Sequence, residues 1–244
     1  MPKIIAQGEI TMFGLEIIKN ILVFITVYIP PLLIFAKFWR KRRRSNLLLV
    51  LIGILYIVSS IFVENFVPFI FVLLNIRYIR CTSEFNEFDI KNFKLIKALN
   101  LTAIFYIISI GISTIQTIIL SNFKVQLEHQ EIVTNMVNMP LKKFLIMVPI
   151  VIIFAPVLEE FVFRWLLFKK IFYGRMGVYL AAFLSSTIFA VIHFSLNAFA
   201  VILWVGLYNC YLMNKKGYWY AVFNHFVFNS ITIAALLTEK LNLM

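Results

Sequence analysis

Long apolar segments dominate this chain and limit the folds that are open to it. Of its 244 residues, 62% are hydrophobic and 14% are charged, whereas an ordinary soluble domain has about 45–50% apolar and about 25% charged residues. A membrane-spanning helix needs about 20 mostly apolar residues. Seven candidate segments can be read along the chain: Leu15–Phe38, Leu47–Leu74, Leu99–Leu120, Phe144–Phe172, Gly177–Phe194, Leu196–Met213 and Tyr218–Leu237.

These segments lack the alternating pattern of a membrane barrel, so each of them is expected to be helical. The sequence therefore predicts an all-α, polytopic transmembrane helix bundle of about seven helices (six to eight). Such a bundle lies in a cell membrane and has lipids as its surroundings.

The apolar segments divide the chain into three expected parts. Residues 1–143 hold the N-terminal transmembrane helices and their loops, residues 144–237 form a four-helix core with short turns, and residues 238–244 are a short C-terminal tail. The longest polar connection, 121–140, is predicted to cover one end of the bundle as an interfacial helix or loop. Within it, we interpret His129 as a solvated loop residue.

Basic residues give the chain a formal net charge of +12 and gather at the ends of the apolar segments. Membrane topology and anionic lipid explain them, so no nucleic-acid partner is expected. The run Arg40–Arg44 marks its loop as cytoplasmic. Further basic clusters lie at 77–97, 169–175 and 215–216. All four loops share one side only if Leu47–Leu74, which polar residues interrupt, turns back instead of crossing once, and the sequence leaves both arrangements open.

Ionisable side chains inside apolar helices distinguish the second half of the chain. A charge near the centre of a membrane helix costs roughly 2.5–3.5 kcal/mol, so such residues indicate a functional site. Three amides of the second half, Asn197, Asn209 and Asn224, are interpreted as packing residues or helix caps. The candidate site residues are Glu159, Glu160, Arg164, His193, His225 and Asn229.

Helical spacing predicts different tasks for the two adjacent glutamates. Glu160 and Arg164 are four residues apart, so they share a helix face and can pair. Glu159 points about 100° away and therefore faces something else. One carboxylate is thus expected to be held by a charge while its neighbour is available for chemistry.

The heights of the remaining groups can be counted from the turns. Glu159 and His193 are equally far from the glycine turn at 174–177, so they are expected at one height across their hairpin. The same count places His225 and Asn229 lower, with both on one face of the last helix. We therefore expect Glu159 to face His193.

This set of groups favours hydrolysis. A carboxylate helped by a histidine can take the proton from a water that attacks a peptide carbonyl. An asparagine and a second histidine can donate hydrogen bonds to the oxyanion that forms. Other hydrolases lack their parts here, because the chain has no serine nucleophile motif, no paired aspartates and no His-Glu-x-x-His sequence.

Three motifs resemble those of a known family. Glu159-Glu160-Phe-Val-Phe-Arg164 resembles the Glu-Glu-x-x-x-Arg motif of the CPBP intramembrane proteases, also called the CAAX protease and bacteriocin-processing, or Abi, family. Phe189-Ala-Val-Ile-His193 is similar to its Phe-x-x-x-His motif, and His225-Phe-Val-Phe-Asn229 to its His-x-x-x-Asn or Asp motif. The motif order agrees over roughly residues 144–237.

The resemblance implies an intramembrane endopeptidase that cleaves a peptide or a membrane protein. It assigns Glu159 as the base on water with His193 as its partner. Glu160 and Arg164 would be an orienting pair, and His225 with Asn229 would form the oxyanion side. The expected setting is a bacterial plasma membrane, with a role in peptide maturation or bacteriocin self-immunity.

Three alternatives stay open at this point. If a metal is bound, Glu159, His193 and His225 would hold a catalytic zinc and leave one position for water. The polar cluster could instead be structural, in a catalytically idle membrane scaffold or immunity protein that binds a peptide or a membrane partner. Buried acids also occur in proton-coupled transporters, although no inverted repeat supports that reading.

Overall fold

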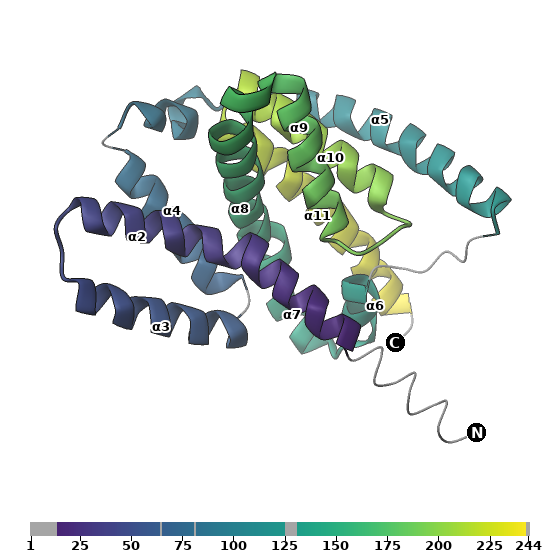
Figure 1. Cartoon of the computed structure of the whole chain (residues 1–244). Helices are drawn as coiled ribbons and strands as arrows, with labels where there is room; N and C mark the ends of the chain where they lie inside the picture. Colours follow the sequence, from purple (N-terminus) through teal and green to yellow (C-terminus); the bar gives the residue numbers. More distant parts are fainter. Residues whose placement is uncertain (1–13, 64, 81, 125–130, 243–244) are drawn as a thin grey trace.

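The computed structural model describes residues 14–63, 65–80, 82–124 and 131–242, and no strand occurs among them. The predicted all-α bundle is confirmed (Figure 1). The first half contains η1 (Phe24–Tyr28), α2 (Ile29–Lys41), α3 (Asn46–Phe62), α4 (Phe66–Ile79), η2 (Ser83–Phe88), η3 (Ile90–Asn92), α5 (Leu95–Asn122) and α6 (Glu131–Asn138). The second half contains α7 (Leu141–Pro149), η4 (Ile150–Phe154), α8 (Ala155–Glu159), η5 (Glu160–Phe172), α9 (Tyr173–Val191), α10 (Phe199–Lys215) and α11 (Tyr218–Asn242).

Four continuous helical stretches in the described part of the chain are long and apolar enough to cross a membrane. They are Gly14–Lys41, Leu95–Asn122, Leu141–Val191 and Tyr218–Asn242. The third of these contains a change of direction, since Gly177 inside it has a φ of 77°, which a glycine adopts without steric cost. The stretch is therefore two passes, as the predicted turn at 174–177 requires.

The apolar segment Leu47–Leu74, whose path the sequence left open, is broken into α3 and α4. Pro68 lies in the first turn of α4, where a missing N–H leaves no hydrogen bond unmade. Side chains of α3 and α4 both donate hydrogen bonds to the helical stretch that precedes them. The Tyr56 hydroxyl of α3 donates to the Tyr28 carbonyl at 2.5 Å, and the Asn75 amide of α4 donates to the Pro31 carbonyl at 2.8 Å. The segment is thus a helical hairpin that returns to the end where it began.

As a result, the four basic loops meet at one end of the bundle, which we call the basic end. The guanidinium of Arg42 lies 4.3 Å from the ring centre of Tyr78, at the end of α4. The Lys94 N–H donates to the Tyr220 hydroxyl at 3.0 Å, which joins the start of α5 to the start of α11. Lys169 donates to the Asn214 side chain at 2.9 Å.

The opposite end, which we call the far end, contains the connection between α3 and α4, the C-terminal end of α5, α6 and the loop 192–198. The side chain of Gln116 on α5 donates to the Leu196 carbonyl in that loop at 2.6 Å. Lys240 on α11 donates to the carbonyls of Val137 and Met139 and so holds α6 against the bundle. The expected cover from 121–140 is therefore present as α6.

His129 lies outside the described residues. The last helix continues through Asn242, beyond the tail boundary expected at residue 238, because Leu236 and Lys240 are buried against the region of α6.

Helices α9 and α10 pack closely at Gly206, and we expect Gly206→Ala to lower the free energy of unfolding by about 1–3 kcal/mol. An added Cβ would lie 2.6 Å from the Cβ of Ser186 and 3.0 Å from its Cα, so the two backbones would have to separate. Thermal unfolding in detergent measures the effect. Gly111→Ala on α5 is the matched control, since a Cβ there meets no atom within 4 Å. Equal effects of the two substitutions would contradict the proposed steric cause.

Candidate active site

Pro156 shapes the backbone that leads to the paired glutamates. Residues Ile150–Phe154 form a π-helical segment, in which the N–H of Ala155 donates to the carbonyl of Ile150. In that i→i+5 pattern the Val151 carbonyl would pair with residue 156, which is a proline and has no N–H. The side-chain amide of Asn229 donates to the Val151 carbonyl instead, at 2.9 Å. The third motif thus supports the helix that carries the first.

The predicted pairing of Glu160 with Arg164 is confirmed. The Arg164 Nε lies 3.1 Å from Glu160 Oε2, and both side chains are completely buried. The guanidinium also lies 4.1 Å from the ring centre of Phe189, a cation–π contact that partly replaces lost hydration. A buried pair of this kind is costly to break, because either partner alone would be an uncompensated charge.

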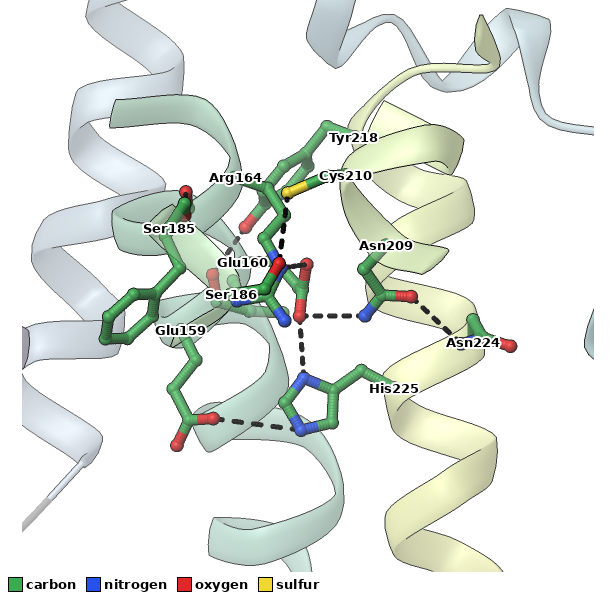
Figure 2. A network of polar contacts seen from close by, with 12 residues as sticks. Glu159, Glu160, Arg164, Ser185, Ser186, Asn209, Cys210, Tyr218, Asn224 and His225 are labelled. Atoms are coloured by element: carbon green, nitrogen blue, oxygen red, sulfur yellow. Dashed lines mark hydrogen bonds and ion pairs between the residues drawn. The ribbon is translucent and has the colours of Figure 1, made fainter. Parts of the chain in front are cut away.

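The other oxygen of Glu160 organises three further side chains, as Figure 2 shows. Glu160 Oε1 accepts hydrogen bonds from Asn209 Nδ2 at 2.9 Å and from His225 Nδ1 at 2.8 Å. The Oδ1 of Asn209 accepts from Asn224 Nδ2 at 2.9 Å. Glu160 is therefore the centre of a network that links η5, α10 and α11.

Sequence reasoning assigned Asn209 and Asn224 only to packing or capping. Both are completely buried in apolar helices, and a buried amide needs hydrogen-bond partners. That requirement was the available signal, but the sequence does not show which partner an amide reaches. The structure shows that Asn209 reaches Glu160 and that Asn224 reaches Asn209.

Glu159 occupies a different environment from its neighbour. Its side chain is 19% exposed, whereas that of Glu160 is not exposed at all. Its carboxylate Oε2 lies 3.7 Å from Nε2 of His225. Because the carboxylate of Glu160 only accepts hydrogen bonds, the Nδ1 of His225 carries a proton. Its Nε2 is the nitrogen that faces Glu159. The structure thus agrees with the prediction that Glu160 pairs with Arg164 while Glu159 faces another group.

The predicted height difference between Glu159 and His225 is wrong. The count from the turns placed His225 well below Glu159, but their side chains lie 3.7 Å apart. The count assumed the rise of an ideal α-helix, whereas Glu160–Phe172 is wound as a π-helix. A π-helix has more residues in each turn and gains less height for each residue. Glu159 therefore lies closer to the basic end than the count suggested.

His193 has its own orienting contact. It lies two residues beyond the end of α9, and its Nδ1 donates to the carbonyl of Phe189 in the last turn of that helix at 2.6 Å. A carbonyl oxygen only accepts, so Nε2 of the neutral ring carries the free lone pair. The Phe189 ring lies edge-on against both His193 and His225, with centroid distances of 4.6 and 5.8 Å. One phenylalanine thus helps to set the position of both imidazoles.

A cavity of about 480 Å³ brings most of the predicted residues together. Four of the six face it at one polar corner: Glu159, His193, His225 and Asn229. Glu160 and Arg164 lie behind this corner, in the protein interior. The remaining wall comes mainly from apolar residues of α5, α6, α10 and α11. The arrangement can hold an apolar chain segment beside a carboxylate and two imidazoles.

The zinc alternative has weak geometric support. Glu159, His193 and His225 line the same cavity. However, among the residues that the structure describes, no three His, Cys, Asp or Glu side chains form a group that could hold a metal ion.

Comparison with known proteins agrees with the motifs. Residues 141–231 match the family model described as type II CAAX prenyl endopeptidase Rce1-like. The chain matches no curated protein and no solved structure. The matched range begins at the first residue of α7 and includes all three motifs, so it covers every candidate site residue. The resemblance to the CAAX protease family is thereby confirmed, and residues 141–231 are an Rce1-like region.

Proposed function

We propose that this chain is an intramembrane endopeptidase that hydrolyses a peptide bond with a water activated by Glu159. One observation supports the proposal above all: Glu159, His193 and His225 line one cavity, and Glu160 Oε1 accepts a hydrogen bond of 2.8 Å from Nδ1 of His225. A partly exposed carboxylate next to two oriented imidazoles suits general-base work. Membership of residues 141–231 in an endopeptidase family supports the same reading.

In the proposed reaction, the Glu159 carboxylate takes one proton from a water whose other hydrogen is donated to the lone pair at His193 Nε2. The hydroxide adds to the peptide carbonyl, and negative charge develops on its oxygen. A protonated Nε2 of His225 and the second N–H of the Asn229 amide are the donors for this oxyanion. Collapse breaks the C–N bond, and Glu159 returns the proton to the leaving amine. The products are a carboxylic acid and an amine.

The substrate is proposed to be an apolar peptide end or a membrane-associated segment. The family description names CAAX prenyl endopeptidases, and a farnesylated peptide is therefore one probe. Unmodified apolar peptides are the other, because a role in peptide maturation or bacteriocin immunity needs no prenyl group. The apolar wall of the cavity suits either probe.

The test is peptide cleavage by the purified full chain in lipid nanodiscs. Mass spectrometry of a mixed library of both probes should show new peptide termini with the wild type. If every probe stays intact while the same preparation retains a bound peptide, the chain is an idle scaffold or immunity protein and the proposal is wrong.

Removal of divalent metals is expected to leave cleavage unchanged within about twofold, since the proposed reaction uses a water activated by Glu159 and the described residues form no group of metal ligands. The measurement compares rates before and after dialysis against a chelator, and after addition of zinc. Loss of activity on dialysis with recovery on zinc addition would instead support a metal held by Glu159, His193 and His225.

A further inference from the structure

The two ends of the bundle differ strongly in charge. Most of the chain's 23 lysine and arginine residues belong to the four loops of the basic end. Five described basic residues belong to the far end or lie near it: Lys19, Lys124, Lys142, Lys143 and Lys240. One of these, Lys240, is buried and bonded to backbone carbonyls. Basic residues near the ends of membrane helices are retained on the cytoplasmic side, so this asymmetry orients the bundle.

An aromatic layer closes the site toward the basic end. Phe88, Phe161, Trp165 and Tyr218 are each at most 3% exposed. The ring of Phe88 lies 4.9 Å from that of Tyr218 and 5.5 Å from that of Trp165, which in turn stacks on Phe161 at 4.7 Å. The Tyr218 hydroxyl donates to the carbonyl of Val157, two residues before Glu159. A second cavity of about 480 Å³ lies at the basic end beside Phe88, but none of the six candidate site residues lines it.

Elements of the far end supply much of the cavity wall. Its wall includes Asn65 from the α3–α4 connection, Thr117 from the C-terminal end of α5, Val133 from α6, and Ser195 and Asn197 from the loop 192–198. All of these elements belong to the far end. The polar corner with Glu159 is thus reached along walls that the far end supplies.

We propose that the site takes its substrate from the extracytoplasmic side, and that the substrate is an apolar peptide segment already translocated or exposed at the outer leaflet. The nature of the substrate rests on the proposed function, whereas the direction of access rests only on the charge asymmetry, the aromatic layer and the cavity wall. The proposal excludes peptides that reach the site from the cytoplasm.

Cysteine labelling tests the direction of access. In a background with Cys81→Ser and Cys210→Ser, single cysteines replace Leu196 in the far-end loop, Thr232 in the cavity wall, or Arg175 at the basic end. Leu196 is 62% exposed, and Arg175 is also exposed. A membrane-impermeant maleimide applied to intact cells should label Leu196→Cys and Thr232→Cys. Arg175→Cys should react only after the cells are permeabilised.

The opposite pattern, with Arg175→Cys labelled in intact cells and the other two protected, would overturn the proposal. Labelling of Leu196→Cys without Thr232→Cys, even after permeabilisation of the membrane, would show that the cavity is closed to the far end and would also overturn it. The experiment does not depend on catalysis, so Glu159→Gln in the same background should label identically. If the labelling is as expected but no peptide is cleaved, the proposed function is wrong and the proposed direction of access still stands.

Discussion

Replacing Glu159 with glutamine is expected to lower the rate of peptide cleavage by about 10²–10⁴-fold, the usual contribution of a general base. The amide has nearly the same size but cannot take a proton from water. Folding should be unaffected, because Glu159 is partly exposed and its carboxylate lies 3.7 Å from Nε2 of His225, which is longer than a hydrogen bond. Initial cleavage rates in nanodiscs, together with the melting temperature of each preparation, measure both effects.

The matched control is Glu239→Gln, an exposed glutamate on α11 and outside the cavity wall. It should cleave at the wild-type rate. Glu159→Gln that remains folded and cleaves as fast as this control would remove Glu159 from the mechanism. A loss of activity that merely follows a loss of folded protein would likewise contradict a role as base.

Arg164→Met is expected to destabilise the protein by about 3–5 kcal/mol, the cost of breaking a buried ion pair from one side. The substitution leaves the Glu160 carboxylate completely buried without its cation, although Asn209 and His225 still donate to it. Chemical or thermal unfolding in detergent gives the change. Lys170→Met, which removes an exposed cation from the last turn of the same helix, outside the Glu160 network, provides the surface control.

A double-mutant cycle separates this cost from other effects. When Glu160→Met is combined with Arg164→Met, no uncompensated charge remains, so the double variant should lose less stability than the sum of the single variants. It should nevertheless be inactive, since His225 has lost the acceptor at Nδ1. Additive losses would show that the pair contributes no coupling energy, and an active double variant would show that Glu160 does not position His225.

Local spacing in the sequence was a reliable guide to some of this structure. The i, i+4 relation of Glu160 and Arg164 gave their contact, because only one turn of a helix separates them. The polar interruption before Pro68 marked the position where the long apolar segment breaks. The turn at 174–177 followed from its glycines. In each case neighbours in sequence determine the geometry, so no knowledge of tertiary packing is needed.

Relations between distant helices were harder to predict. The height of Glu159 relative to His225 depends on the π-helical winding of Glu160–Phe172, which apolar periodicity does not reveal. The role of Asn209 depends on which side chain faces it across the bundle. Whether the segment Leu47–Leu74 crosses or returns depends on bonds from Tyr56 and Asn75 to an earlier helix. All three properties arise from packing between elements.

The α3–α4 hairpin also determines whether the number of membrane passes before the later loops is even or odd. Its two arms are short, with 17 and 14 residues, or about 25 and 21 Å at the rise of an α-helix. Together they add an even number of passes between Arg40–Arg44 and every later loop. A chain that lost one of the two helices would have an odd number, and its second half could keep its fold only by inserting in the opposite orientation. Natural loss or gain of helices before residue 141 should therefore occur in pairs.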